Sequence, residues 1–556
     1  MSVVLVIGGY GGFGARLSRR LANAGHDVIV AGRDLRKAQL FCESLPGARA
    51  ARIDRAAVAE AIDQLRPDVV ADASGPFQNA DYSVARACVE ARIHYVDLAD
   101  ARDFVAGIGA LDDAARAAGV CVISGASSVP ALSGAVARKL SEGMQEVRLV
   151  EIAISSTSRA TSGDAVVKAI LSYVGSPVRL WRGGRWVSVL GWGEPRRVNF
   201  AVPGRKPLNG RMVQVADVPD LETLPPALPG NPSVVFRAGG ELTIGNQSLR
   251  VLGLLVQGGF MRSLSPLAPF LIWAARKTSG WGVDASAMSM RVVGFEAQKT
   301  HGGALAAVEK TWTLVAEEGH GPEIPTMALP LCVEAILDGR VASGARHAGG
   351  VLTLEDFEPG FAALSISHET KSSVLPPPLY ERVMGRGCLA LPGSVREMHR
   401  VAGDCGAQGE AVVEGPATFA ARAVRKMMRF PEPGQHPVHV SFAEMEGKEV
   451  WTRDFGGKAF HSELSEKKGR LIERFGPLRV AFDLPVAGIG SSKGNGLEMK
   501  LRGWSVFGVP LPLALAPRSR AKEWDERGVF QFEVPIELPL IGLVIRYRGW
   551  LKPVKA

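Results

Sequence analysis

The sequence has few of the features that stabilise secreted or metal-binding proteins. Six cysteines are scattered over 556 residues, no two of them form a Cys-x-x-Cys pair, and no histidines cluster near them. This spacing argues against a disulfide framework and against structural zinc, so we expect no metal site. The first residues, MSVVLVIGGYGG, lack the basic region and the cleavage site of a signal peptide. We therefore expect a cytoplasmic protein.

Long apolar runs are missing as well. No uninterrupted apolar stretch reaches the roughly 18 residues that a membrane-spanning helix needs. The most apolar segment, residues 249–275, is interrupted by Arg250, Arg262, Pro266 and Pro269. We interpret it as buried helices or as helices that lie on a membrane surface, which leaves peripheral membrane contact open.

Charge does not single out one partner. The net charge is +9, from 65 Lys and Arg against 56 Asp and Glu, but no motif interleaves aromatic and basic residues. Nucleic acid is therefore not an expected partner. With 46% hydrophobic and 22% charged residues, the composition is that of a globular protein with real cores. At about 100–200 residues per domain, the length predicts about three domains.

A glycine-rich turn near the start is the most informative motif. Residues 3–7 form an apolar, β-branched run that predicts a buried strand, residues 15–24 predict a helix, and residues 28–31 predict a second strand. Between the first strand and the helix lies a G-x-G-x-x-G pattern. Its glycines let the backbone approach a pyrophosphate, and the helix N-terminus attracts the phosphate charge. The turn therefore predicts a Rossmann dinucleotide site made by Gly8, Gly9, Tyr10, Gly11, Gly12, Phe13 and Gly14.

The residues after the second strand distinguish NADP from NAD. An acidic residue at this position binds the ribose 2′-hydroxyl of NAD, whereas a basic residue accommodates the 2′-phosphate of NADP. Here the strand ends in Ala31-Gly32-Arg33, and Arg36 and Lys37 follow one turn later. We therefore predict that Arg33 and Lys37 contact the 2′-phosphate, and that the cofactor is NADP rather than NAD.

The strand–helix alternation continues and places more of the predicted cofactor site. A third strand closes with Asp54, which is placed to approach the adenine, and residues 69–73 form a fourth strand that leads into Ser74, Gly75 and Pro76. Nicotinamide is expected beside this turn, because ligands bind at the carboxyl ends of the strands. No residue shows a clear acid or base signature, so the catalytic residues stay unassigned. We interpret Tyr82 as structural.

The order of these motifs resembles the saccharopine dehydrogenase-like oxidoreductases. The likeness rests on the glycine turn, Ala31-Gly32-Arg33, Ala73–Phe77, His94–Leu98 and Ser127–Pro130, and it covers about the first 360 residues. It implies a Rossmann domain that binds NAD(P) and a central domain inserted before the last Rossmann helices. It also implies that Gly8, Gly11, Gly14 and Arg33 bind the dinucleotide, with Ser74, Gly75 and Pro76 at the nicotinamide end. The segments 451–455, 473–477 and 546–550 resemble a bacterial domain of unknown function that often accompanies such proteins.

The C-terminal third predicts a curved antiparallel sheet. A basic helix is expected over residues 417–430, either lying on a membrane surface or covering the sheet with its charges in water. Alternating segments then predict strands at 438–442, 450–455, 478–484, 497–504, 530–536 and 543–550. The sheet encloses an apolar interior, which is either a packed core or a pocket for an acyl chain.

The predicted fold class is α/β: an N-terminal Rossmann fold with an inserted α+β central domain, followed by a β-rich α+β C-terminal domain. The expected boundaries are 1–130 for the Rossmann domain, with its last helices in 322–360, then 131–321, a linker at 361–378 containing three prolines, and 379–556. We predict NADP-dependent hydride transfer with an unidentified small-molecule substrate, for which the apolar segments favour a lipid-derived compound. Two alternatives stay open: an NADP(H)-binding sensor or membrane-surface scaffold without turnover, and an amino-acid-pathway dehydrogenase.

Overall fold

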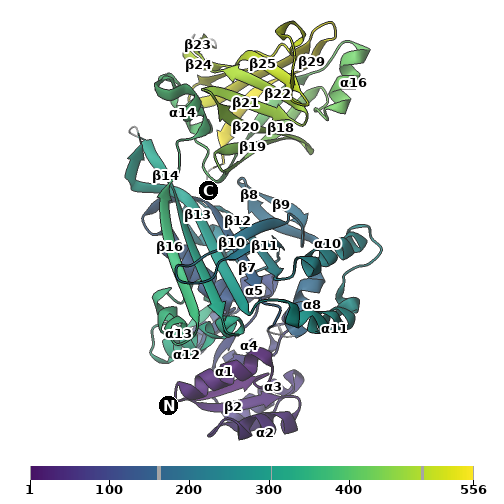
Figure 1. The fold of residues 1–556 in the computed structure, drawn as a ribbon. Helices are drawn as coiled ribbons and strands as arrows, with labels where there is room; N and C mark the ends of the chain where they lie inside the picture. Colours follow the sequence, from purple (N-terminus) through teal and green to yellow (C-terminus); the bar gives the residue numbers. More distant parts are fainter. Residues whose placement is uncertain (1, 160–163, 302–303, 490–493, 555–556) are drawn as a thin grey trace.

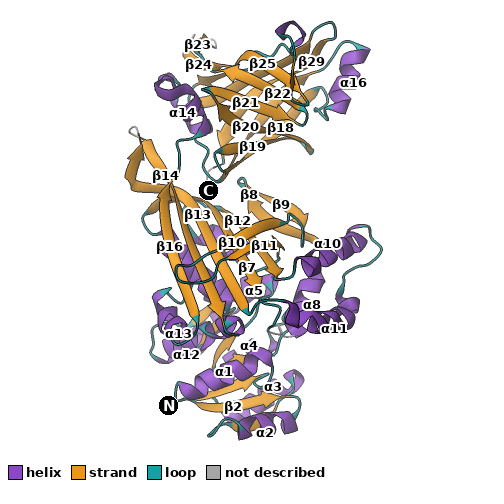
Figure 2. Cartoon of the chain, in the orientation of Figure 1, coloured by secondary structure: helices purple, strands orange, loops and turns teal. Residues whose placement is uncertain are grey.

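The computed structural model describes residues 2–159, 164–301, 304–489 and 494–554. Three large sheets follow one another along the long axis of the molecule, with the N-terminal sheet at one end and the C-terminal sheet at the other (Figure 1). Helices surround the first sheet and flank the second, whereas only a few short helices accompany the third (Figure 2). This arrangement confirms the predicted fold class.

The first sheet is parallel and has the strand order of a Rossmann fold. Its inner strands are buried along most of their length because helices cover both faces, which explains their apolar sequences, whereas the edge strand Arg49–Arg52 is partly exposed. In sheet order the strands are β15 (Gly344–His347), β6 (Cys121–Ser124), β5 (His94–Asp97), β4 (Val69–Asp72), β1 (Val3–Ile7), β2 (Asp27–Gly32) and β3 (Arg49–Arg52). The helices are α1 (Gly12–Asn23), α2 (Leu35–Glu43), α3 (Val58–Leu65), α4 (Ser83–Glu90), α5 (Arg102–Gly107), α6 (Asp112–Ala118) and α12 (Ala328–Leu337).

The second sheet is mixed and lies between the other two. Its strands, in sheet order, are β10 (Arg196–Phe200), β11 (Leu208–Val215), β12 (Ser233–Gly240), β7 (Met144–Ser156), β13 (Ala285–His301), β14 (Ala304–Glu317) and β16 (Ile366–Val374). The hairpin predicted around residues 181–187 forms from β8 (Pro177–Arg182) and β9 (Arg185–Leu190). The helices are α7 (Ser133–Ser141), α8 (Asp164–Tyr173), α9 (Asp220–Ala227), α10 (Thr243–Gln257), α11 (Ala268–Thr278) and α13 (Glu358–Ala362).

The linker predicted over residues 361–378 is wrong for most of its length. Ile366–Val374 form β16, which pairs antiparallel with β14 and becomes an edge strand of the central sheet. Its outward residues are polar or exposed, so the segment lacks the apolar signature of a buried strand. Only the Pro-rich residues 375–378 separate this strand from helix α14 (Leu379–Met384).

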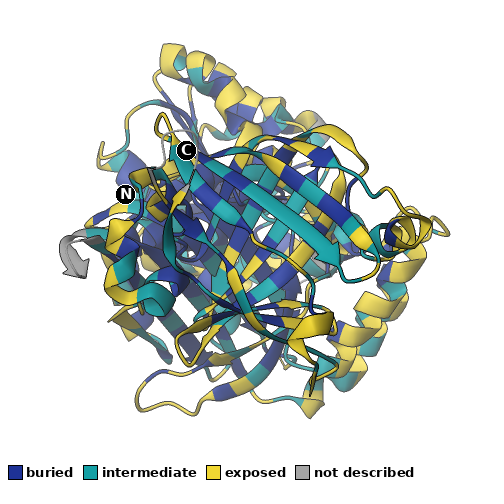
Figure 3. Cartoon of the chain, turned by 90° about the horizontal axis from the view of Figure 1, so that it is seen from above, coloured by how far each residue is buried: buried dark blue, intermediate teal, exposed yellow. Residues whose placement is uncertain are grey.

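The third sheet has thirteen antiparallel strands, ordered β23-β24-β27-β28-β29-β17-β18-β19-β20-β21-β22-β25-β26. Three successive hairpins close through two-residue turns ending in Gly447, Gly457 and Gly469, whose positive φ angles suit such turns. The predicted strand at 497–504 is wrong as a single element, because it divides into β24 and β25, which pair with different neighbours. Buried and exposed positions alternate along many of the strands (Figure 3).

The remaining bounds of the C-terminal part are as follows. The strands are β17 (Asp404–Glu414), β18 (Gly434–Met445), β19 (Lys448–Phe455), β20 (Lys458–Lys467), β21 (Arg470–Phe475), β22 (Leu478–Asp483), β23 (Val486–Ile489), β24 (Gly494–Glu498), β25 (Lys500–Val506), β26 (Val509–Pro510), β27 (Lys522–Glu526), β28 (Val529–Leu538) and β29 (Gly542–Pro553). The helices are α14, α15 (Gly393–Met398) and α16 (Phe419–Met427).

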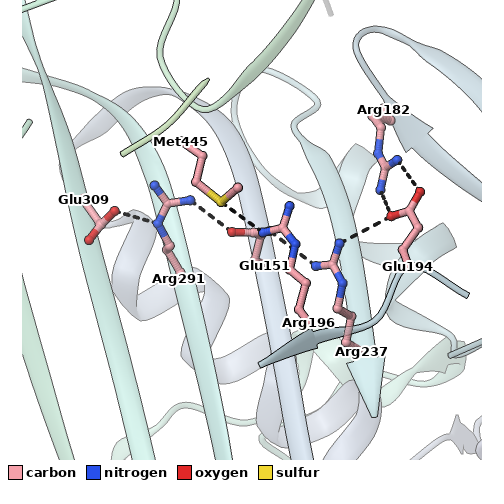
Figure 4. Close-up of polar contacts among 8 residues, drawn as sticks. All are labelled: Glu151, Arg182, Glu194, Arg196, Arg237, Arg291, Glu309 and Met445. Atoms are coloured by element: carbon pink, nitrogen blue, oxygen red, sulfur yellow. Dashed lines mark hydrogen bonds and ion pairs between the residues drawn. The ribbon is translucent and has the colours of Figure 1, made fainter. Parts of the chain in front are cut away.

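A cluster of ion pairs lies on the central sheet beside the C-terminal part (Figure 4). Glu151 on β7 receives three guanidinium groups, from Arg196 and Arg291 at 3.0 Å and from Arg237 at 3.3 Å. Arg291 also pairs with Glu309 at 2.6 Å. Burial by itself raises the pKa of Glu151, but the three arginines outweigh it and lower that pKa. The cluster therefore keeps a largely buried carboxylate ionised.

Candidate cofactor and substrate site

The glycine turn has the close packing that a dinucleotide site requires. Gly8 has a positive φ of 77° and bonds through its N–H to the carbonyl of Ala31 at 2.8 Å, so the turn is fixed to the end of β2. A Cβ on Gly14 would collide with the carbonyl oxygen of Gly8, which makes glycine necessary there. These are the roles that glycine plays in a Rossmann turn.

Helix α1 begins directly after this turn and presents its N-terminus at the carboxyl edge of the sheet. No side chain caps the helix at Gly11, and its first turn contains no acidic residue. The N–H groups of this twelve-residue helix and its positive dipole end are therefore suited to a pyrophosphate. Gly8, Gly9, Gly11, Gly12 and Gly14 thus lie where the sequence predicts a phosphate cradle.

The tip of β2 presents basic side chains to solvent. The side chains of Arg33 and Arg36 are exposed and make no hydrogen bond or ion pair within the described part of the chain. Lys37 lies 3.7 Å from Asp34, whose side chain caps α2. The Tyr10 hydroxyl accepts the N–H of Asp34 at 3.1 Å, so Tyr10 fixes this loop against the glycine turn. Arg33 is thus available to a 2′-phosphate, whereas Lys37 is already partly neutralised.

The other predicted cofactor residues lie at the ends of β3 and β4. Asp54 is exposed two residues after β3 ends, near the outer edge of the sheet. Ser74 is positioned by Asp72, whose carboxylate accepts the Ser74 N–H at 2.9 Å and the hydroxyl at 2.5 Å. Asp72 is itself buried and pairs with Arg55 at 3.1 Å. The Ser74-Gly75-Pro76 turn is therefore fixed at the carboxyl end of the sheet, where nicotinamide is expected.

A cavity of about 290 Å³ lies between this edge and the central sheet. Phe13 of the glycine turn lines it, together with Leu98 after β5 and Ser127 after β6. The opposite wall comes from the central sheet and from α8, including Ile154, Phe236 and Met288. The lining is mainly apolar with a few polar groups, as in small-molecule sites.

Two carboxyl groups face this cavity from opposite domains. Asp100, after β5, accepts a hydrogen bond from Gln78 at 3.3 Å, and burial raises its pKa above the ordinary value. Asp217, in the central domain, pairs with Arg102 at 3.1 Å, and burial raises its pKa despite that cation. A carboxyl group with a raised pKa in a cavity suits proton transfer.

Sequence reasoning missed both carboxyl groups. Asp100 lies two residues after the predicted strand His94–Leu98. Ligands bind at the carboxyl ends of the strands, and this rule, which located Ser74, also points to Asp100. Asp217 had no such signal, because only the packing of two domains brings it to the cavity. The buried Asp97 has another role: it accepts N–H groups of Gly125 and Ala99, at 2.7 and 2.9 Å, and fixes the loops around the cavity. Burial raises its pKa to about 7.

Several other aromatic residues stay outside the site. The Tyr82 hydroxyl donates to the carbonyl of Phe104 at 2.8 Å, which agrees with the structural interpretation. Trp181 and Trp186 pack edge to face at 5.5 Å, and Trp192 is buried.

Residues 4–123 match the family model of the saccharopine dehydrogenase NADP binding domain. The N-terminal part of the chain is a saccharopine dehydrogenase-type NADP-binding domain. Residues 391–551 match a second model, described as a domain of unknown function (DUF4166). Both family resemblances predicted from the motifs are therefore confirmed. No curated protein was found to match the chain.

Solved structures with similar folds include an apo saccharopine dehydrogenase (L-Glu forming) from Saccharomyces cerevisiae. The two chains are 13% identical with a TM-score of 0.46, and the match covers 67% of this chain and all of the other. A serine dehydrogenase from Escherichia coli is 20% identical with a TM-score of 0.19, covering 22% of this chain and 80% of the other. A putative betaketoacyl-ACP reductase is 22% identical with a TM-score of 0.18, covering 22% and 71%.

Proposed function

We propose that this saccharopine dehydrogenase-like protein is an NADP-dependent oxidoreductase with an apolar, uncharged substrate. The observation that carries the proposal is the cavity of about 290 Å³ that Phe13 of the glycine turn shares with the central sheet. A substrate in this cavity lies beside the expected nicotinamide position, and NADP supplies or accepts the hydride. The reacting group is a C=O, C=N or C=C bond.

Asp100 is the proposed proton donor or acceptor in this reaction. It lines the cavity, its carboxyl is held in place by Gln78, and burial favours its protonated form. Asp217 is less available because Arg102 already binds it. Reduction of a carbonyl or imine places negative charge or a free lone pair on the heteroatom, which a nearby carboxylic acid protonates.

The cavity favours this function over an amino-acid-pathway dehydrogenase. An amino-acid substrate carries a carboxylate, which proteins bind with arginine or lysine. None of the described residues that line the cavity is an arginine or a lysine. A sensor or scaffold without turnover is the remaining alternative, and it predicts cofactor binding with no oxidation of NADPH by any substrate.

The test is a fluorescence titration with NADPH and NADH, followed by a screen of aliphatic aldehydes, ketones and enones for NADPH oxidation. Micromolar binding of NADPH together with turnover of at least one uncharged substrate supports the proposal. NADPH binding without turnover of any class favours the sensor, and turnover of amino acids alone favours the amino-acid dehydrogenase. Failure to bind either nucleotide contradicts all three.

Replacing Arg33 with glutamate tests the choice of NADP. Arg33 is an exposed cation at the tip of β2, and charge-assisted hydrogen bonds to it contribute about 1.5–3 kcal/mol. We expect R33E to raise the Kd for NADPH about 100-fold and to change the Kd for NADH less than about 3-fold. Arg86→Glu, at an exposed position on α4, is the matched control. Equal loss of both nucleotides contradicts the 2′-phosphate assignment.

We further propose that helices α10 and α11 dock on an anionic membrane and bring the cavity close to an apolar substrate. α11 contacts α8, which lines the cavity (Figure 1). No described helix is long and apolar enough to span a bilayer. Between residues 242 and 283 there are four cations and no acidic residue, so the segment is attracted to anionic lipid. Seven large apolar side chains in it are more than half exposed: Ile244, Val251, Leu254, Phe260, Phe270, Trp273 and Trp281.

Co-sedimentation with vesicles tests this docking. We expect binding to phosphatidylglycerol vesicles that weakens at high salt, and little binding to phosphatidylcholine vesicles. Replacing both Phe260 and Trp273 with serine is expected to reduce binding at least about ten-fold, because these exposed side chains insert at the interface. The control is Phe507→Ser, an equally exposed phenylalanine in the turn before β26. A loss of the same size in the control contradicts the assignment of α10 and α11.

A further inference from the structure

A second cavity lies inside the C-terminal sheet, far along the chain from the cofactor site. Its volume is about 210 Å³, and its walls are inward side chains of six or more strands, among them Val440, Phe482 and Phe532. Protein interiors contain few voids larger than a water molecule. An apolar cavity of about 150 Å³ is already large enough to bind benzene. A void of this size in an otherwise packed sheet therefore has room for a ligand.

The wall of this cavity includes a small polar patch in which nearly every buried group is paired. Arg453 donates to Glu473 at 3.3 Å and to Ser462 at 2.9 Å. Glu523 forms a 2.5 Å hydrogen bond with His399, on which the Tyr380 ring stacks with centroids 3.6 Å apart. These contacts leave little capacity for a charged ligand group.

The Tyr380 hydroxyl is the exception. Tyr380 lies on α14, lines the cavity and is fully buried. Among the described lining residues, its hydroxyl is the one buried polar atom without a hydrogen-bond partner. Leaving such a group unpaired is unfavourable, so a ligand acceptor that reaches the hydroxyl through a shift of the neighbouring side chains gains affinity. Burial raises the pKa of Tyr380 well above its usual range, so the hydroxyl keeps its proton and donates.

The charges of the wall select against an anionic ligand. The described lining residues contain two carboxylates, Glu473 and Glu523, and a single arginine, Arg453, which is already paired with Glu473. A fatty-acid carboxylate placed here loses its hydration and meets no unpaired cation among the described lining residues. A neutral oxygen acceptor has a much smaller desolvation cost.

We propose that the C-terminal domain is a binding module for an uncharged lipophile that carries a hydroxyl or carbonyl group, with that oxygen accepting a hydrogen bond from Tyr380. Val424 of helix α16 and Met428, which directly follows the helix, line the cavity, and Thr418 before its first residue donates a hydrogen bond to the carbonyl of Ile541 at 3.0 Å. This helix packs against the inner strand β29 and thus covers one side of the ligand (Figure 1). The site is separate from the cofactor site, so it does not depend on the proposed reaction.

The test uses the full chain and the neutral fluorescent probe N-phenyl-1-naphthylamine. We expect saturable 1:1 binding, displacement by 1-decanol or 2-decanone, and displacement by decanoate that is at least ten-fold weaker at pH 8. Ala521→Trp, which fills the cavity, is expected to weaken probe binding at least ten-fold. Ala481→Trp, on the outward side of β22 between the cavity residues Val480 and Phe482, is the matched control and is expected to leave it unchanged.

Tyr380→Phe isolates the hydroxyl without filling the cavity. We expect it to weaken the displacement by 2-decanone five- to ten-fold and to alter probe affinity less than two-fold. Unchanged NADPH binding in each variant shows that the first domain is intact. The proposal is overturned by the absence of saturable probe binding, by unchanged binding in A521W, or by decanoate competing as well as decanol. It is also overturned if Y380F leaves 2-decanone affinity unchanged.

Discussion

Asp100→Asn is expected to lower kcat for the best substrate about 1,000-fold while changing the Kd for NADPH less than two-fold. A positioned acid or base contributes roughly 10²- to 10⁴-fold to a reaction that moves a proton. Asparagine keeps the shape of Asp100 and its contact with Gln78, but it cannot transfer the proton. Because Asp100 lines the substrate cavity and not the glycine turn, cofactor binding is expected to survive. Steady-state kinetics and the fluorescence titration measure the two quantities on the same sample.

The pH profile separates a catalytic role from a structural one. Burial raises the pKa of Asp100 above its ordinary value of 3.8, so the limb of the pH–rate profile that Asp100 controls lies above that value. If Asp100 donates the proton, the rate falls as the pH rises through its pKa, and this limb disappears in D100N. Asp103→Asn, at an exposed position on α5, is the control. A D100N variant with wild-type kcat would remove Asp100 from the mechanism.

Glu151→Leu is expected to destabilise the central sheet by about 3 kcal/mol or more. Removing this carboxylate leaves the guanidinium of Arg237, which is only 4% exposed, with its weaker contact to Glu194 at 3.4 Å. Removing one partner of a buried ion pair typically costs about 3–5 kcal/mol, because a buried charge loses its compensation. For a unit of 150–250 residues, this corresponds to a fall in Tm of about 6–12 °C. Calorimetry of the full chain measures the transition, and NADPH binding reports on the first domain.

The same cluster supplies the control and the pH dependence. Glu309→Leu removes the half-buried carboxylate that pairs with Arg291, but Arg291 keeps its 3.0 Å contact with Glu151. We therefore expect the free energy of unfolding to fall by less than about 1 kcal/mol. The folded-state pKa of Glu151 is lowered from 4.5, so its stabilisation is fully present above pH 4.5 and is lost as the pH falls through the folded-state pKa. The difference between wild type and E151L is therefore expected to narrow in acid. A difference that stays constant to pH 3 contradicts the ion-pair explanation.

The sequence by itself determined the first domain and the position of its cofactor turn. Val3–Ile7, the glycine turn and the helix after it lie next to one another in the chain, so their structure depends on local periodicity and on glycine at fixed positions. Arg33 was found in the same way, because the residue at the end of the second strand lies beside the glycine turn in any such fold. The hairpins of the C-terminal sheet also carry local signals in their glycine turns.

Only the tertiary structure decided which residues surround the substrate cavity. Asp217 reaches it because the central sheet packs on the carboxyl edge of the first sheet, and no local pattern records that contact. The edge strand β16 was missed for a related reason: its residues are mostly polar, and its pairing with β14 is set by register and not by apolar content. The Tyr380 hydroxyl likewise becomes a binding group only where α14 closes over the C-terminal sheet. These features depend on contacts between distant segments, whereas sequence periodicity reports only on neighbours along the chain.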